Sequence, residues 1–256
     1  MNVDDNTQSN TFSIDEIIDE VDTNLEYIAK YVVAKEIKQE DSNLIKQHKK
    51  QFFIEIDSPE QHQPDWHQWG IITHTRNFMK TYDNEVKQYL KAWNKLNTIE
   101  EHLSELIDGI SKSKLIYLGI LLHDIGKFKK QYSIELNWKV KYSFNKHEIY
   151  SQEIILNDLY PLLHNYYGLT DIQIIYISMC ARYHGFIRKI VKKLEYGYIT
   201  EFAQSEEFKN ILLNELASLE EYKIEIGILF LADSCAKTDV AFENRTDKEI
   251  LEDLEL

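Results

Sequence analysis

The chain has 256 residues, of which 43% are hydrophobic, and it carries a formal net charge of −14 with only 8 glycines and 3 prolines. This length and apolar content are enough for one large domain with a substantial core. The negative charge argues against a general nucleic-acid binder, because neutralising a phosphate backbone requires an excess of Lys and Arg. The scarcity of Gly and Pro favours long helices over many short strands joined by tight turns, so we predict an all-α fold.

The charge is unevenly distributed along the chain. Residues 1–66 carry 15 acidic against 6 basic side chains and residues 194–256 carry 16 against 5, whereas residues 112–193 carry 13 basic against 6 acidic. A locally basic region in an acidic protein suits a small anionic ligand better than a long polyanion. We therefore expect a small anionic substrate, and no long nucleic acid, as the partner.

The two cysteines and the N-terminal sequence bear on the compartment. Cys180 and Cys235 lie in apolar stretches without paired metal-ligand spacing, which indicates reduced, buried thiols. The N-terminal residues are acidic and lack the basic and apolar regions of a signal peptide, and no apolar run reaches membrane-spanning length. These features predict a cytoplasmic protein without a membrane segment.

The first part of the chain is expected to be a tail, a helix and a loop. Residues 1–12 are polar and predict a disordered tail. A helix is predicted from a capping-box pattern at Ser13 to about Lys38, because apolar residues recur at spacings of three and four. Residues 39–68 are polar and irregular and predict a loop, in which the stretch 51–57 forms a short strand or an extended strap.

Downstream of this loop, apolar periodicity predicts helices. One runs from Gly70 to about Asn94, and a charged, exposed one runs from about Thr98 to Ile110. The stretch KLIYLGILLHDIG is apolar around nearly its whole circumference, which marks a buried central helix ending near Gly126. Three more are predicted, at about 146–158 before Pro161, at about 170–184 with Thr170 as its cap, and at about 219–238.

A His–Asp pair, His123–Asp124, stands at the end of the predicted central helix. Burying a carboxylate is costly unless it is paired or bound to a cation, so a core helix that ends in His-Asp needs a partner for this charge. Imidazole and carboxylate are common ligands of divalent ions, and a metal would be one such partner. The alternative is a capped helix end with a surface Asp and a hydrogen-bonded His, and the dipeptide alone does not decide between the two.

Three further histidines and one aspartate lie on the neighbouring predicted helices. His74 lies on a helix before the pair, His147 opens the helix after it, His184 ends the next, and Asp233 lies within the last apolar helix. A lone His on an amphipathic helix is more often a packed or surface residue than a ligand. Asp233 is harder to explain in that way, because an aspartate within ILFLADSCA is expected to be buried and to need compensation.

This order of His, then His-Asp, then Asp on separate helices, with LLHDIGK as the central motif, resembles the HD-domain superfamily of metal-dependent phosphohydrolases. The resemblance covers roughly residues 64–240. The stretches DWHQWGIITHT, LLHDIGK, HExxS and LAD are similar to HD domains found beside tRNA nucleotidyltransferases. The resemblance implies an all-α HD-domain helical bundle over residues 67–240, preceded by an N-terminal helix and strap at 13–66 and followed by an acidic C-terminal tail at 241–256.

The resemblance also implies a metal centre in which two divalent ions are bound. The first ion would take His74, the His-Asp pair and Asp233, while Asp124 would bridge to a second ion held by the two additional histidines. Such a pair clamps both oxygens of an in-line phosphoryl displacement and activates water, so that Asp124 counts as catalytic as well as metal-binding. The metal, among Fe, Mn, Ni, Co and Mg, is left open. The implied ligands are His74, His123, Asp124, His147, His184 and Asp233.

Basic residues near the implied ligands are candidates for binding the phosphate group. By the resemblance, Lys127 would point towards the pocket and bind a phosphate oxygen as a catalytic point charge, and the alternative is a helix-terminal Lys that bonds backbone carbonyls. Arg76, Arg182, Arg188 and Lys189 lie within a few residues of ligands, and one or two of them are expected to contact the anion.

The remaining histidines are assigned from their sequence context. His67 matches a position of the nucleotidyltransferase-associated pattern and is expected to lie behind the ligands or to face the substrate. The histidines in polar or charged stretches are predicted to be surface residues: His48, His62, His102 and His164.

Three functions fit these residues. The first is hydrolysis of a nucleotide or another small phosphate mono- or diester by metal-activated water. The second is oxidation of a small anionic substrate by a di-iron pair, as in a minority of HD proteins, and the third is a regulatory module with a structural metal. The ligands alone do not separate them. We favour the phosphohydrolase, because most family members hydrolyse phosphate bonds and the basic third of the chain supplies an anion field. The long charged segment 95–113 is expected to form a lid or a homodimer contact.

Overall fold

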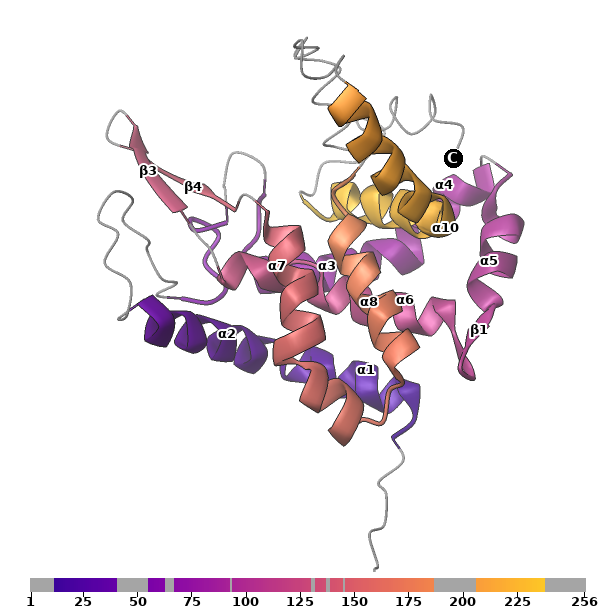
Figure 1. Cartoon of the computed structure of the whole chain (residues 1–256), viewed down its shortest axis with the longest axis horizontal. Coiled ribbons are helices and arrows are strands. Elements are labelled where there is room, and N and C mark those ends of the chain that lie inside the picture. Colours follow the sequence, from indigo (N-terminus) through magenta and orange to yellow (C-terminus); the bar gives the residue numbers. More distant parts are fainter. Residues whose placement is uncertain are drawn as a thin grey trace, which may run out of the picture.

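The computed structural model describes residues 12–40, 55–62, 67–92, 94–129, 132–136, 139–144, 146–186 and 206–237. Within these ranges the chain is a helical bundle with two small hairpins, which confirms the all-α prediction (Figure 1). No helix in the described part of the chain is long and apolar enough to span a bilayer. The predicted tails and most of the predicted strand at 51–57 lie outside the described residues.

Two helices replace the single N-terminal helix that the sequence predicts. Helix α1 (Ile14–Thr23) begins at the expected capping box, in which the Glu16 backbone N–H lies 3.3 Å from the Ser13 hydroxyl. The helix is interrupted at Asn24, which has a φ angle of −93° and a ψ angle of 7°. The Asn24 side chain donates at 2.8 Å to the Glu20 carbonyl oxygen, which also accepts from the Asn24 backbone N–H at 3.0 Å. Helix α2 (Leu25–Glu40) follows, and the two run one after the other along one side of the molecule (Figure 1).

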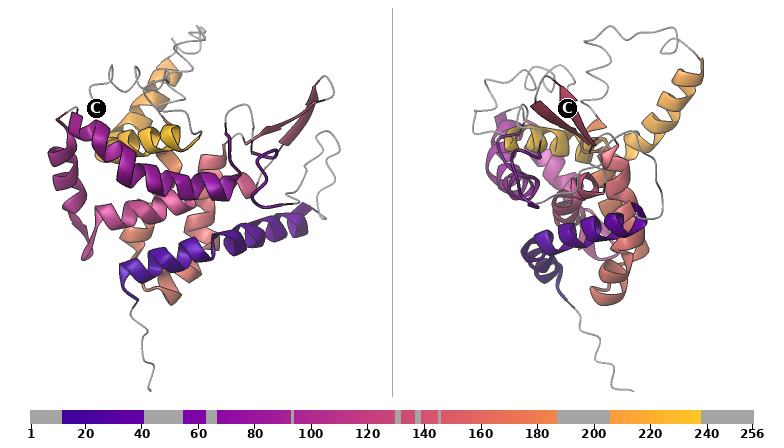
Figure 2. Two further views of the ribbon diagram at one scale, coloured as in Figure 1. Left: turned by 180° about the vertical axis from the view of Figure 1, so that it is seen from behind. Right: turned by 90° about the vertical axis from the view of Figure 1, so that its left-hand side faces the viewer.

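The helix predicted from Gly70 to Asn94 is present in three joined parts. Helix α3 (Ile71–Thr81) continues through the π-helical segment η1 (Tyr82–Val86) into α4 (Lys87–Ala92). Together they form a rod along one side of the bundle, and α6, described below, lies between this rod and α1 (Figure 2, left).

The helix predicted to end at Ile110 is wrong in its second half. Helix α5 (Leu96–Ser104) stops, and a two-residue turn joins strands β1 (Leu106–Ile107) and β2 (Ile110–Ser111) in an antiparallel hairpin. Asp108 and Gly109 occupy the turn with φ angles of 47° and 85°. Asp-Gly favours this left-handed turn geometry, which a helix does not allow.

The segment 95–113 does not form a lid over the His-Asp pair. The Asp108 carboxylate accepts a hydrogen bond from the Thr170 hydroxyl at 2.7 Å, and His102 Nε2 lies 2.8 Å from a carboxylate oxygen of Glu225. These contacts hold the segment at the start of α6 (Lys112–Leu122), whereas His123 follows the other end of that helix. A homodimer contact through this segment stays a prediction.

Helix α6 is the buried centre of the bundle, as its apolar circumference predicts. Its side chains Leu115, Ile116, Leu118 and Ile120 have no exposed surface. A Cβ at Gly119 would lie only 2.6 Å from the Cβ of Cys180, so this glycine allows α6 to approach helix α8 (Asp171–Tyr183) closely. Both cysteines are buried free thiols, as predicted.

A second hairpin, which the sequence analysis did not predict, follows the central helix. The short 3₁₀ segment η2 (Ile125–Phe128) leads to strands β3 (Tyr132–Leu136) and β4 (Lys139–Ser143), which pair in antiparallel fashion. The hairpin projects from the bundle on the side of α2 (Figure 1).

The remaining helices lie close to their predicted positions. Helix α7 (His147–Glu153) continues as the π-helical segment η3 (Ile154–Asp158). Pro161 begins the next segment, η4 (Pro161–Tyr166), since a first helical position needs no N–H donor. Helix α8 (Asp171–Tyr183) has the predicted Thr170 cap, and helix α10 (Glu206–Ala236) begins earlier than predicted and packs on α3 and α8.

Candidate metal centre

The His-Asp pair occupies the turn between α6 and η2, in the interior of the bundle. His123 has no exposed surface and Asp124 is 1% exposed. Ser151 on α7 fixes this turn, because its hydroxyl donates to the His123 carbonyl oxygen at 2.6 Å and accepts from the Gly126 N–H at 2.9 Å. The end of the central helix is thereby tied to α7.

Four histidines around this turn share one hydrogen-bond pattern, in which ring Nδ1 lies 2.7–3.3 Å from a backbone carbonyl oxygen. Because a carbonyl only accepts, Nδ1 is the donor, and the neutral ring has a lone pair on Nε2. This is the tautomer that binds a metal through Nε2. The pairs are His74 with Ala236, His123 with Ile120, His147 with Phe144 and His184 with Ala181.

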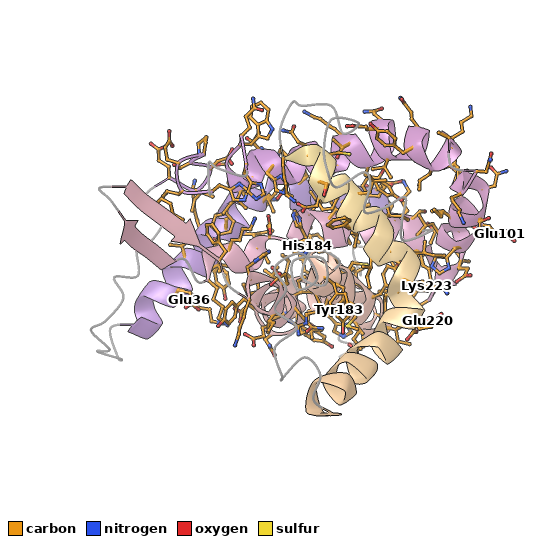
Figure 3. All side chains as sticks on the ribbon, turned by 90° about the horizontal axis from the view of Figure 1, so that it is seen from above. Glu36, Glu101, Tyr183, His184, Glu220 and Lys223 are labelled. Atoms are coloured by element: carbon orange, nitrogen blue, oxygen red, sulfur yellow. The ribbon has the colours of Figure 1, made fainter. Side chains whose placement is uncertain are left out.

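Burial keeps two of these rings neutral near neutral pH. Desolvation lowers the pKa of His74 below its ordinary value and lowers the pKa of His184 to about 3. His184 lies near the middle of the molecule, in contrast to Glu101 and Glu220 at its edge (Figure 3). These two imidazoles therefore present an unprotonated Nε2 at the pH of ordinary assays.

The Nε2 atoms of the four histidines converge on the Asp124 carboxylate. Oδ2 of Asp124 lies 3.2 Å from His123 Nε2 and 3.7 Å from His74 Nε2. Oδ1 of Asp124 lies 3.2 Å from His147 Nε2 and 3.7 Å from His184 Nε2. Each carboxylate oxygen therefore faces two imidazole nitrogens, which is the arrangement expected of a ligand shared between two ions.

Asp233 joins the same cluster from helix α10. One of its carboxylate oxygens lies 3.0 Å from His74 Nε2, and the other lies 2.7 Å from the Lys237 ammonium. Burial acts to raise the pKa of Asp233, but Lys237 and His74 outweigh it and hold the pKa well below its usual range. Asp233 is therefore an anionic ligand candidate, as the sequence predicts for an aspartate within an apolar helix.

The chemistry of this donor set fits divalent cations. Carboxylate oxygens and unprotonated Nε2 atoms are all acceptors. Lys127 and Lys237 each donate to one carboxylate oxygen, but the carboxylates and the Nε2 atoms have no proton to share with one another. His147 Nε2 and His184 Nε2 lie 3.4 Å apart, and His123 Nε2 and Asp124 Oδ1 have no hydrogen-bond partner within the described part of the chain. Buried acceptors without donors are costly, and a cation would satisfy them together.

Two overlapping groups of residues have donor atoms within 4.8 Å of one another and could each hold an ion. They share His123, and together with His147 they contain all six ligands implied by the resemblance. The first consists of His74, His123 and Asp233, and the second of His123, Asp124 and His184.

Lys127 lies beside Asp124 and does not cap the end of its helix. Its ammonium is 2.6 Å from Asp124 Oδ2 and 2.7 Å from His62 Nε2, and the side chain is buried. The prediction of a surface position for His62 is wrong, since this residue has no exposed surface. Residues 58–62 form a turn, in which the His62 N–H donates to the Pro59 carbonyl oxygen at 3.0 Å, and this turn directs the ring inward.

The arginine predictions have different outcomes. The Arg76 guanidinium binds Asp22 on α1, with Nε 3.0 Å from a carboxylate oxygen and Nη2 3.1 Å from the backbone oxygen, and its assignment as an anion contact stays a prediction. Arg182 is partly buried two residues before His184, and its assignment stays a prediction. Arg188 and Lys189 lie outside the described residues.

The predictions for the other histidines have different outcomes. His67 is buried, and its ring stacks on that of His62 with centroids 3.9 Å apart. His102 is mostly buried, with 19% of its side chain exposed, and contacts Glu225. His164 has 42% of its side chain exposed, in agreement with the surface prediction, and its Nδ1 donates to the Leu169 carbonyl oxygen. His48 lies outside the described residues.

The buried histidines predict an acid-sensitive metal-free protein. Because the pKa of His184 is lowered in the folded state, the unfolded chain binds more protons below pH 6.5, and stability falls as the pH falls. We expect His184 alone to contribute a loss of about 2 kcal/mol between neutral pH and roughly pH 5. The lowered pKa of His74 makes stability fall with pH in the same direction. The lowered pKa values of Asp124 and Asp233 add a loss of stability only below pH 3.8. Urea unfolding of chelator-treated protein measures this, and a flat profile from neutral pH to roughly pH 5 contradicts it.

Comparison with known families agrees with this geometry. The family model of the HD domain matches residues 89–238, which is more than half of the chain. A search of curated proteins finds no match. The match begins after His74, so helix α3 and the segment that carries His62 and His67 lie outside it. The similarity to the tRNA-nucleotidyltransferase-associated type stays a prediction. The chain belongs to the HD-domain family, whose members are typically metal-dependent hydrolases.

Proposed function

We propose that this protein is a phosphohydrolase that uses two divalent ions to hydrolyse a small phosphate ester, most simply a nucleotide. The observation that carries the proposal is the convergence of four histidine Nε2 atoms on the two oxygens of a buried carboxylate, Asp124, at 3.2–3.7 Å. A set made only of acceptors, with its ring orientations already fixed, is suited to hold cations.

In this proposal the six residues of the centre divide between two ions. His74 and Asp233 would hold the first ion together with the His-Asp pair, and His147 and His184 would hold the second, with Asp124 shared. Bound divalent ions supply Lewis-acid stabilisation of phosphoryl oxygens and lower the pKa of a water molecule.

The protein's own side chains bind and orient the ester. Lys127 would bind a phosphoryl oxygen as a point charge, since its ammonium lies within 2.6 Å of Asp124 and therefore at the centre itself. The ammonium also lies 5.6 Å from the centroid of the Phe144 ring, which is a cation–π distance. This contact favours a position of the ammonium beside the ring.

The test is metal content followed by phosphate release. Protein purified under anaerobic conditions is expected to contain two metal ions per chain and to release phosphate from a panel of nucleoside monophosphates and model diesters. A chelator is expected to abolish the release and added metal to restore it. Chelation also removes the stabilisation by bound metal, about 2.7 kcal/mol for metal at a hundredfold excess over its Kd, which a melting curve detects.

Other results would contradict the proposal. Absence of bound metal after anaerobic purification and after reconstitution overturns the centre. Two irons with oxygen consumption and no phosphate release favour the di-iron oxygenase that shares the same ligands.

A further inference from the structure

Residues 55–62 are the described part of the predicted strap, and from here on the word strap means these residues. The strap is fixed to the start of helix α3. The Thr73 backbone N–H donates to Asp57 Oδ1 at 3.0 Å, and the Thr73 hydroxyl donates to Asp57 Oδ2 at 2.5 Å. A carboxylate here satisfies a free N–H at the helix N-terminus and interacts well with the helix dipole. A Cβ at Gly70 would lie 2.3 Å from the Asp57 carbonyl oxygen, so the strap and the helix start are in close contact.

The strap ends at His62, whose ring is fixed on three sides. Its Nδ1 donates to the Trp69 carbonyl oxygen at 2.8 Å, so Nε2 has the lone pair and accepts from the Lys127 ammonium at 2.7 Å. Its face stacks on the His67 ring, with an interplanar angle of 21°. The ring thus has one orientation, and that orientation points its acceptor at Lys127.

This geometry argues against His62 as a seventh metal ligand. Its Nε2 is 4.0 Å from Asp124 Oδ2, farther than the Nε2 of any of the four histidines described above. Its lone pair is occupied by an ammonium, which a metal would have to displace. His62 acts on the lysine and not on the ions.

We propose that His62 is a positioning residue that holds the Lys127 ammonium at the metal centre for binding the phosphoryl group of the substrate. A lysine has a flexible four-carbon stem and three donors, so one contact does not fix its ammonium. Asp124 and His62 take two of the three N–H groups and thereby direct the third, which we assign to a phosphoryl oxygen. The proposal rests on the proposed function for its substrate, and its positioning residue, His62, lies outside the family match over residues 89–238.

The experiment compares variants of His62 in the full chain loaded with metal. His62→Phe keeps a stacking ring and removes the acceptor, while His62→Gln keeps an acceptor near the position of Nε2. The probe is inorganic phosphate, measured by calorimetry, and metal per chain is measured on the same samples. We expect His62→Phe to weaken phosphate binding about tenfold with metal content unchanged, as loss of a hydrogen bond to a charged group predicts, and His62→Gln to recover most of the affinity.

A double-variant cycle separates positioning from a merely structural role. Lys127→Met is expected to weaken phosphate binding at least as much as His62→Phe, and adding His62→Phe to Lys127→Met is expected to change nothing further. If His62→Phe does not fold, His62→Asn replaces it, because the shorter amide cannot reach the ammonium and so contrasts with His62→Gln.

Four results would overturn the proposal. The first two are full phosphate affinity in His62→Phe and a loss of metal in that variant. The third is an equal loss of phosphate affinity from His62→Phe in the presence and in the absence of Lys127. The fourth is no phosphate binding by the metal-loaded wild type. If the variants follow the expected pattern but no ester is hydrolysed, the proposed function fails and the positioning role stands. If His62→Phe hydrolyses esters as well as the wild type does, the proposed function stands and the positioning role fails.

Discussion

Asp124→Asn is expected to abolish hydrolysis and most metal binding, with a loss in kcat/KM of at least about a thousandfold. The substitution removes the single negative charge on which four Nε2 atoms converge at 3.2–3.7 Å. It also places an amide –NH₂ group beside two of the histidine Nε2 atoms. The amide N–H groups can donate to the Nε2 lone pairs that would otherwise bind a metal ion. Because the neutral amide no longer pairs with the buried Lys127 ammonium, which lies 2.6 Å from Asp124 Oδ2, the metal-free variant is expected to be less stable than the metal-free wild type by about 3 kcal/mol.

The measurement is metal per chain, phosphate release and unfolding free energy on the same preparation. Asp19→Asn is the matched control, because Asp19 is an exposed carboxylate on α1, and it should leave all three unchanged. A variant at Asp124 that retains two ions and full phosphate release would remove the carboxylate from the mechanism. A metal-free Asp124→Asn protein as stable as the metal-free wild type would mean that the pair of Asp124 with Lys127 contributes no stability.

Gly126→Ala is expected to destabilise the protein by about 3 kcal/mol or more, at the upper end of what overpacking costs. The new Cβ would lie 2.1 Å from the His147 carbonyl oxygen and 2.4 Å from the Ser151 backbone nitrogen. Both are backbone atoms, which cannot rotate away, so relief requires α7 to shift away from η2. Because α7 carries His147, the same shift should weaken binding of the second ion.

Chemical unfolding of metal-free protein and metal titration test this expectation. Gly168→Ala provides the contrast: its φ angle is 76°, but no heavy atom lies within 4 Å of an added Cβ. That variant is expected to lose only about 1 kcal/mol from backbone strain and to keep metal affinity. Equal losses at the two glycines would show that steric contact with α7 is not the cause.

The parts of the fold that the sequence predicts well are those with local causes. The apolar circumference of KLIYLGILLHDIG identifies the buried helix α6, and capping boxes identify the starts of α1 and α8. The Asp-Gly turn at 108–109 is equally local, but it lies inside a charged periodic segment that predicts a helix as far as Ile110, and the helix prediction is wrong there. The β3–β4 hairpin has no comparable turn signal in the described residues.

The site shows where sequence proximity misleads. Arg76 is two residues from His74, but two residues on a helix correspond to a rotation of about 200°, so its side chain faces α1 while His74 faces Asp124. His62 lies at the site although the sequence does not suggest it. It stands twelve residues and a turn before His74, and its sequence neighbours are polar. Only the path of the strap brings it to Lys127, and no periodic pattern describes that path.

The histidine hydrogen bonds imply an order of assembly during folding. The rings of His123, His147 and His184 are each oriented by a carbonyl three residues earlier, so these orientations form with their own turns of chain. His74 is oriented by Ala236, 162 positions away, and it meets Asp233 only when α3 docks on α10. The pocket that we propose for the first ion therefore closes late, and metal uptake in a refolding experiment would report the docking of the C-terminal helix.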